Sequence, residues 1–182
     1  MGQGGVLLLA EPGRGEALSD QDIVRRYQRR IYAVLYRMVG GGTEVEDLCQ
    51  DTFLQVLKNP NGLLAARDPD AWVYRIAMNV AVDFIRRKAR GRGLEGRPAA
   101  GREAPPVAGP EPESAAWRAL DELSPQLRQV VVLRIFEGMS HEQIAVVLDA
   151  SVGTIRWRLF EARRKLGELL GPHLKHLKEG QP

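Results

Sequence analysis

Apolar residues recur at helical spacing along most of the chain. One such set follows a spacing of three and four residues: Val45, Leu48, Cys49, Thr52, Phe53, Val56 and Leu57. This spacing predicts an amphipathic helix, which Asn59–Gly62 (NPNG) then ends. An earlier helix is predicted from Asp20 to Val39, before a run of three glycines. The alternating pattern of half-buried strands is absent, so the sequence predicts an all-α fold.

The next predicted helix begins at Asp68-Pro69, where aspartate can cap the helix and proline suits its first turn. The residues that this helix is expected to bury are Trp72, Val73, Ile76, Ala77, Val80 and Phe84. The stretch between the two helices, Lys58–Asp70, is predicted to be a loop.

The second half of the chain repeats these start and stop signals. Ser124-Pro125 begins a helix that Gly138 ends, and Ser140–Gln143 (SHEQ) has the pattern of a capping box. A short helix is predicted to run to about Leu148. After the break at Asp149–Ser151, a longer helix has its apolar face at Val152, Ile155, Leu159, Ala162 and Leu166. Two helices joined by so short a turn are typical of a helix-turn-helix.

Composition divides the chain into two units. Residues 89–113 contain five glycines, five prolines and no aromatic residue. Such a stretch buries too little apolar surface to offset the entropy of ordering it, so it predicts a flexible linker. We therefore expect small helical domains at residues 18–90 and 114–172, a linker at 91–113, and tails at 1–17 and 173–182.

Composition also narrows the classes of protein. Of 182 residues, 44% are hydrophobic and 27% are charged, as in folded soluble proteins. The apolar run near the start of the chain, Val6–Ala10, is too short to span a membrane. The single cysteine, Cys49, excludes an internal disulfide and favours a reducing compartment, so we expect the protein in the cytoplasm. A net charge of +3 hints only weakly at an anionic partner.

The last predicted helix is strongly basic. Its polar face carries Arg156, Arg158, Arg163, Arg164 and Lys165, together with Thr154, Trp157 and one acid, Glu161. A helix of this kind fits the major groove of DNA, where its first residues reach base edges and later arginines hold phosphates. Glu161 is either a partner of Lys165 along the helix or an acceptor for a cytosine amine. The alternative to DNA binding is that the whole basic face is simply exposed to solvent.

A second polar stripe follows the helix that starts at Pro69. It consists of Arg75, Asn79, Asp83 and Arg87, and it is extended by Arg86, Lys88, Arg90 and Arg92. These side chains can bond to base edges and neutralise a phosphate backbone. Alternatively, a ladder of charges four residues apart only stabilises an exposed helix.

A third, acidic surface lies on the helix around residues 45–57. It carries Glu44, Glu46, Asp47, Gln50 and Asp51. The first three complement the positive end of the helix dipole, but Asp51 lies too far along the helix for that explanation. This acidic surface therefore remains a candidate for docking another protein. The sequence shows no metal-ligand cluster, since His173 and His176 have no third partner, and no catalytic motif, so we expect neither a cofactor nor an enzyme.

These residues together resemble a known family. Glu46–Phe53, Ala71–Asn79, Asp83 and Arg86-Arg87 are similar to region 2 of an extracytoplasmic-function (ECF) sigma factor of the sigma-70 family. The second half resembles region 4 through Leu123, Pro125, Arg128, Gly138, Ser140, Glu142, Ile144-Ala145, Ser151–Arg156 and Ala162-Arg163. Both motifs occur in the family's order, with a linker between them.

The resemblance implies a transcription initiation factor that binds core RNA polymerase and directs it to promoters. The residues placed where the family docks on the β′ clamp helices are Asp47, Gln50, Asp51 and Phe53. Those placed at the −10 element, which the family opens, are Arg75, Asn79, Asp83, Arg86 and Arg87. Those placed at the −35 duplex are Ser151, Thr154, Arg156, Trp157, Arg158, Glu161 and Arg163.

Further partners follow from the same resemblance: the β flap of the polymerase, promoter DNA and an anti-sigma factor. The resemblance departs at one place, because the glycine-rich start leaves little room for the helical segment that usually precedes Tyr27–Met38. Two other classes remain open. One is a helix-turn-helix regulator that acts without being a polymerase subunit. The other is an adaptor whose acidic helix is its functional surface.

Overall fold

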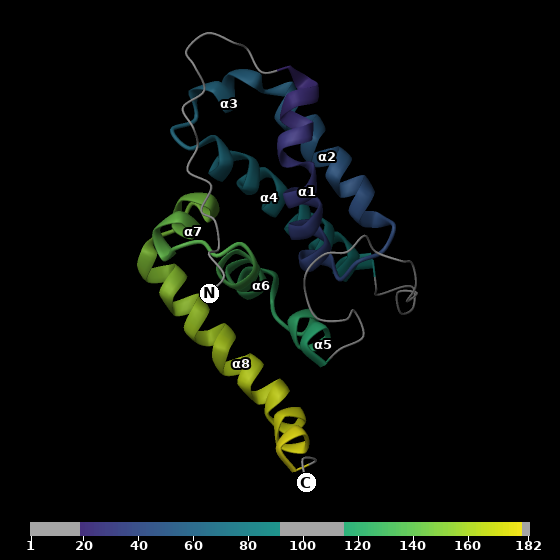
Figure 1. The fold of residues 1–182 in the computed structure, drawn as a ribbon, viewed down its shortest axis with the longest axis vertical. Coiled ribbons are helices and arrows are strands. Elements are labelled where there is room, and N and C mark those ends of the chain that lie inside the picture. The colour runs from purple at the N-terminus through teal and green to yellow at the C-terminus, as the bar shows by residue number, and fades with distance from the viewer. Residues whose placement is uncertain (1–18, 92–114, 180–182) are drawn as a thin grey trace.

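The computed structural model describes residues 19–91 and 115–179, and in these residues it is helical with no strand (Figure 1). The helices of the first half are α1 (Asp20–Val39), α2 (Glu44–Lys58), α3 (Pro60–Ala65) and α4 (Pro69–Gly91). Those of the second half are α5 (Ala115–Asp121), α6 (Pro125–Val131), the π-helix η1 (Val132–Phe136), α7 (His141–Leu148) and α8 (Val152–Glu179). The predicted all-α class is confirmed.

The segments predicted as the N-terminal tail and the linker lie outside the described residues, apart from Gly91 at the end of α4. At the other end, α8 continues to Glu179, so most of the segment predicted as a C-terminal tail is helical. Residues 180–182 are not described.

Helix α1 has the bounds that the sequence predicts. Ser19 caps its start, because the Ser19 side chain accepts a hydrogen bond from the Asp22 amide at 3.2 Å. Gly40 ends it in the left-handed conformation, with φ of 84°, and its amide donates to the Tyr36 carbonyl at 3.0 Å. Local signals alone therefore define this helix.

The stretch from Lys58 to Asp70, predicted as a loop, contains the short helix α3. Helix α2 does end at Lys58, but Asn59 then caps a new helix by accepting a hydrogen bond from the Gly62 amide at 2.9 Å. Asn59-Pro60 is a cap followed by proline, the same signal as Asp68-Pro69. The loop prediction was wrong because that signal was interpreted only as the end of α2.

Helix α4 is buried on more than the face that the sequence predicts. Val73, Ala77 and Val80 are in the core as expected, but Trp72, Ile76 and Phe84 are only half-buried. The residues of α4 that are buried without having been predicted so are Ala71, Tyr74, Met78, Ala81 and Val82. This second buried face reflects the second half of the chain, because α6 and α7 both pack against α4.

The second half contains the predicted helix-turn-helix. The capping box of α7 is present: the Ser140 hydroxyl accepts from the Gln143 amide at 3.2 Å, and the Gln143 side chain accepts from the Ser140 amide at 2.8 Å. Asp149 ends α7 in the left-handed conformation, with φ of 50°. Ser124 precedes α6, but its side chain makes no capping hydrogen bond, in contrast to the prediction.

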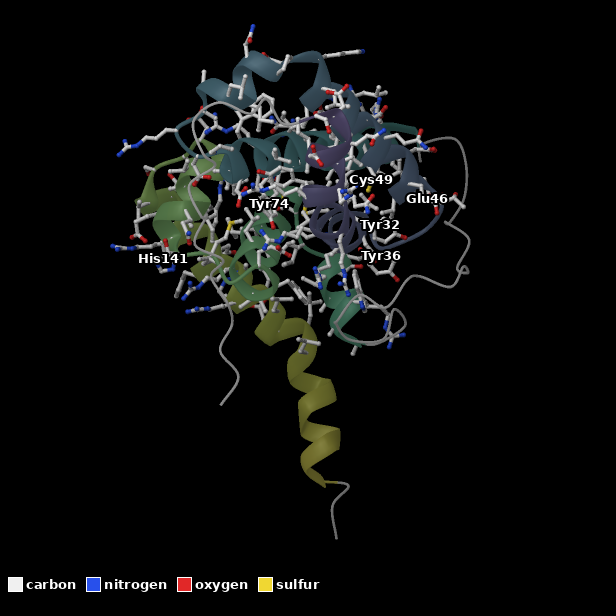
Figure 2. The ribbon with its side chains drawn as sticks, turned by 45° about the horizontal axis from the view of Figure 1, so that its top comes forward. Tyr32, Tyr36, Glu46, Cys49, Tyr74 and His141 are labelled. Atoms are coloured by element: carbon white, nitrogen blue, oxygen red, sulfur yellow. The ribbon has the colours of Figure 1, made fainter. Side chains whose placement is uncertain are left out.

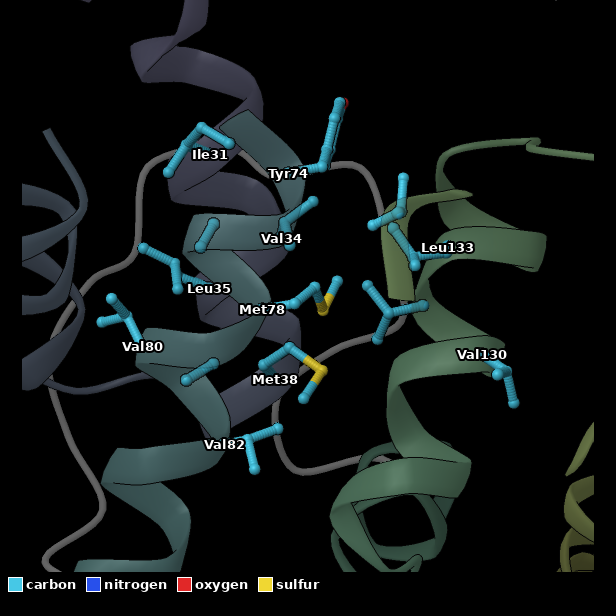
Figure 3. Close-up of a cluster of buried hydrophobic side chains, with 14 of the residues drawn as sticks. Ile31, Val34, Leu35, Met38, Tyr74, Met78, Val80, Val82, Val130 and Leu133 are labelled. Carbon is cyan, nitrogen blue, oxygen red and sulfur yellow. The ribbon is translucent and has the colours of Figure 1, made fainter. Parts of the chain in front are cut away.

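The two halves lie side by side and share one apolar core (Figure 3). Met38 of α1 and Met78 of α4 point toward Leu133 of η1 in that figure, and all three are fully buried. The π-helix continues directly from α6 and brings Leu133 to this contact. The core of the first half is therefore completed by side chains of the second.

Candidate nucleic-acid and protein interfaces

The acidic surface of α2 presents three of the four residues assigned to polymerase docking. Asp47, Gln50 and Asp51 are exposed, whereas Phe53 is only 9% exposed and belongs to the core. Phe53 therefore packs the helix in place and presents little surface to a partner.

Glu44, at the start of α2, has a local role. Its carboxylate pairs with the Lys88 ammonium at 3.1 Å. A hydrogen bond from its own backbone amide, together with Lys88, holds the pKa of Glu44 below its ordinary value. The ion pair and the helix dipole thus account for Glu44 but not for Asp51.

The polar stripe on α4 is divided between two environments. Asn79, Asp83, Arg86 and Arg87 are exposed and lie on one open face. Arg75 is half-buried against the second half, where it donates to the backbone of α7 at 3.2 Å (Nε to Val147 O) and at 2.5 Å (Nη2 to Val146 O). The structure therefore separates Arg75 from the rest of the stripe.

The basic face of α8 is open to solvent. Arg156, Trp157 and Arg163 are exposed, and Thr154 and Arg158 are half-buried. At the start of the helix, the Ser151 hydroxyl accepts from the Thr154 amide at 3.1 Å and lies 2.9 Å from the Thr154 hydroxyl. Ser151 therefore caps the helix that the sequence predicts to enter the major groove.

Glu161 is paired within α8. Its carboxylate accepts from both Nε (3.1 Å) and Nη2 of Arg164, and Arg164 Nη1 also donates to Glu168 at 2.6 Å. These hydrogen bonds lower the pKa of Glu161. Glu161 is thus hydrogen-bonded to Arg164, whereas the predicted partner, Lys165, acts on it only through its charge.

Of two exposed aromatic side chains on α8, only Trp157 was predicted from the sequence. Trp157 is 62% exposed and Phe160, three residues later, is 66% exposed. The apolar spacing of Ile155, Leu159 and Ala162 leaves Phe160 outside the buried face, and this spacing is the signal that could have identified it. Helix α8 therefore presents two exposed aromatic rings within one turn.

Two negative findings concern the described residues. Within 19–91 and 115–179, no group of three or more His, Cys, Asp or Glu side chains is arranged to hold a metal ion. Over the same ranges, none of the helices combines the length and the apolar character that a membrane span needs.

Comparison with known families covers both halves of the chain. Residues 23–91 match Sigma-70 region 2, and residues 114–166 match Sigma-70, region 4. The chain is 30% identical over 172 residues to the ECF RNA polymerase sigma factor SigW of Bacillus subtilis, covering 86% of this chain and 91% of that protein. The chain belongs to the ECF subfamily of the sigma-70 family. The resemblance seen in the sequence is confirmed.

Other relatives agree with this assignment. The ECF RNA polymerase sigma factor SigE of Mycolicibacterium smegmatis is 32% identical over 161 residues, which cover 84% of this chain but only 62% of that protein. The sigma factor RpoE of Bartonella quintana, solved with the anti-sigma factor NepR, shares the fold at 24% identity and a TM-score of 0.66, over 83% of this chain and 96% of that one. CnrH, solved with the cytosolic domain of CnrY, gives 28% identity and a TM-score of 0.59, over 87% and 91% of the two chains.

Proposed function

We propose that this sigma factor binds core RNA polymerase and directs it to promoters through three surfaces: the acidic face of α2, the open face of α4 and the basic face of α8. The observation that carries the proposal is the succession of the two sigma regions in one chain, each with an exposed polar face. The chemistry of RNA synthesis belongs to the polymerase, so the chain acts as a subunit and not as an enzyme. Its place of action is the cytoplasm, with the polymerase.

Docking on the polymerase is assigned to the first half, with a second contact from the other half. Asp47, Gln50 and Asp51 form an exposed acidic patch that suits a basic surface on the β′ clamp helices. The second contact, on the β flap, is assigned to residues 114–172. Two weak contacts with one polymerase together give tighter binding, because the second contact forms within a complex that the first has already made.

Opening of the −10 element is assigned to the face of α4. Asn79 and Asp83 are exposed polar groups that can bond to the edges of an unpaired base. Arg86 and Arg87 lie one turn further along and can neutralise the phosphates of the displaced strand. Arg75 joins this set only when it leaves α7.

Recognition of the −35 element is assigned to α8. The capped start, at Ser151 and Thr154, is the end of the helix whose side chains reach base edges. Arg156, Trp157 and Arg158 follow on the same part of the helix, and Arg163 lies further along, where it holds phosphate. Glu161 contributes by positioning Arg164.

An inhibitory protein partner is also proposed. RpoE of Bartonella quintana was solved in complex with an anti-sigma factor, and CnrH in complex with the cytosolic domain of CnrY. These complexes support the expectation that this chain, too, is held by an anti-sigma factor.

The test is run-off transcription from promoter fragments with purified core polymerase, with and without the protein. We expect specific transcripts only in its presence, and we expect Arg156→Ala to abolish them, whereas Glu122→Ala, at an exposed acid of the same half, leaves them unchanged. Tight and specific binding to duplex DNA without polymerase, and no transcripts, would instead identify a classical regulator.

A further inference from the structure

One leucine interrupts the polar face of α2. Leu54 is 53% exposed, whereas the other large apolar side chains of this helix are buried or half-buried against the core. In the described residues of α1, α2 and α4, Leu54 is also the one large hydrophobic side chain that is exposed. Exposed leucines are common on protein surfaces, so what matters is the position of this one.

Leu54 lies among the residues assigned to polymerase docking. It follows Asp51 by three residues and Gln50 by four, so these side chains share one face of the helix. Asp47 lies two turns before Leu54 on the same face, and Lys58 lies one turn after it, at the end of α2. The exposed face of α2 is therefore an apolar side chain with charged and polar side chains around it.

The structure changes which residue is the apolar member of this face. The resemblance places Phe53 at the docking position, but Phe53 is 9% exposed and belongs to the core. Successive residues of a helix are rotated by about 100°, so Leu54 is exposed where Phe53 is buried. Leu57, one turn later, is half-buried against the core, and its exposed part adds to the apolar surface beside Leu54.

This face of α2 is accessible in the free protein. The helix packs against α1, α4 and α3, and Figure 1 shows it at the side of the molecule away from α7 and α8. In Figure 2, Glu46 of α2 lies at the outer edge of the molecule. A partner can therefore reach Leu54 without any rearrangement of the chain.

Charged and apolar groups contribute differently to a contact between proteins. Acidic side chains attract a basic partner and speed its approach, but salt screens that attraction and burial removes their hydration. An apolar side chain does little for the approach, yet it holds the complex together once water has left the contact. The centre of such a contact is therefore depleted of charged groups, which lie around it.

We propose that Leu54 is the apolar anchor of the contact with core polymerase. It fits an apolar site on the β′ clamp helices, where Asp47, Gln50 and Asp51 lie around it and meet basic groups. The acidic side chains set the rate of association, and Leu54 sets the lifetime of the complex. This inference rests on the proposed docking of α2, and it gives the apolar role to the neighbour of the residue that the resemblance indicates.

The experiment measures association and dissociation of the full-length protein on immobilised core polymerase, without DNA, by biolayer interferometry. Leu54→Gln keeps the length of the side chain and its helix propensity but makes its end polar. Leu54→Met keeps the side chain apolar. The matched control is Leu64→Gln, at a leucine of α3 that is 69% exposed but does not lie on α2. Asp51→Asn removes one charge from the docking face.

We expect Leu54→Gln to dissociate about five to ten times faster than the parent protein, because burial of the exposed half of the leucine is lost. Its association rate should stay within about twofold of the parent rate. Leu54→Met and Leu64→Gln should behave as the parent does. Asp51→Asn should instead associate more slowly. That defect should shrink between about 0.1 and about 0.5 M salt, whereas the defect of Leu54→Gln should persist.

A folded Leu54→Gln protein that dissociates no faster than the parent overturns the proposal, and so does an equal effect in Leu64→Gln. If circular dichroism shows that Leu54→Gln loses helix content, Leu54→Ala takes its place, and an unchanged dissociation rate there has the same consequence. Slower association of Asp51→Asn with unchanged dissociation of Leu54→Gln would refute only the anchor. Parent-like kinetics in both variants would refute the proposed docking of α2 as well.

Discussion

The capping box of α7 gives a prediction whose size follows from the structure. Ser140→Ala removes the hydroxyl that accepts from the Gln143 amide at 3.2 Å, while the return bond from the Ser140 amide to the Gln143 side chain, at 2.8 Å, can still form. The helix has only eight residues, so its unpaired amides are a large share of its backbone groups. The substitution therefore weakens the first helix of the helix-turn-helix.

The expected cost can be bounded. Replacing a serine cap by alanine costs about 0.5–2 kcal/mol of the free energy of unfolding, whereas replacing it by glycine costs only a few tenths. Both hydrogen bonds of the capping box are exposed to solvent, so water can take the place of the Ser140 hydroxyl as a partner for the Gln143 amide and reduce the cost. We therefore expect about 0.5–1 kcal/mol for Ser140→Ala. For a chain of this size, 1 kcal/mol corresponds to roughly 2–4 °C in melting temperature.

Urea denaturation followed by far-UV circular dichroism measures this cost, with Ser140→Gly as the matched control. The midpoint should fall for alanine, with an unchanged slope, and should hardly move for glycine. Glycine also lacks the hydroxyl but suits the N-cap backbone better than alanine does, so an equal loss for both substitutions would show that this advantage of glycine is absent at the start of α7. A loss in alanine of less than about 0.3 kcal/mol would refute the magnitude argued from the cap.

Three further predictions concern the proposed surfaces. Asp51→Arg reverses an exposed charge on α2 and should weaken pull-down of core polymerase without loss of helix content; unchanged binding would exclude this docking face. Replacing exposed Asn79 and Asp83 together by alanine should leave polymerase binding intact but impair open-complex formation, and a pre-melted −10 bubble should restore some activity. Arg163→Ala should weaken transcription from all members of a −35 library alike. Glu161→Ala should leave the base preference unchanged because its carboxylate is held by Arg164, so a preference relaxed at one base pair would instead reveal a base contact.

Local signals were sufficient for most helix bounds. Ser19 and Gly40 define α1, and the box at Ser140 defines α7, because capping depends on groups within one turn of the helix end. The missed helix α3 carried the same kind of signal at Asn59-Pro60. The family motifs likewise identified which polar residues to examine, since those residues lie close together in the sequence.

The amino-acid sequence by itself thus determined the longer helices, their order and the family, whereas the short helices α3 and α5 and the π-helix η1 were not predicted. Only the tertiary structure decided which polar groups are available, because that depends on contacts between distant residues. Arg37 and Glu137 are 100 positions apart, and no periodicity along the chain indicates that they pair. The second buried face of α4, and the burial of Arg75 against α7, arise in the same way. The amphipathic spacing of a helix reveals the apolar face that packs within its own half of the chain. A second face, buried against the other half, depends on how the two halves pack together.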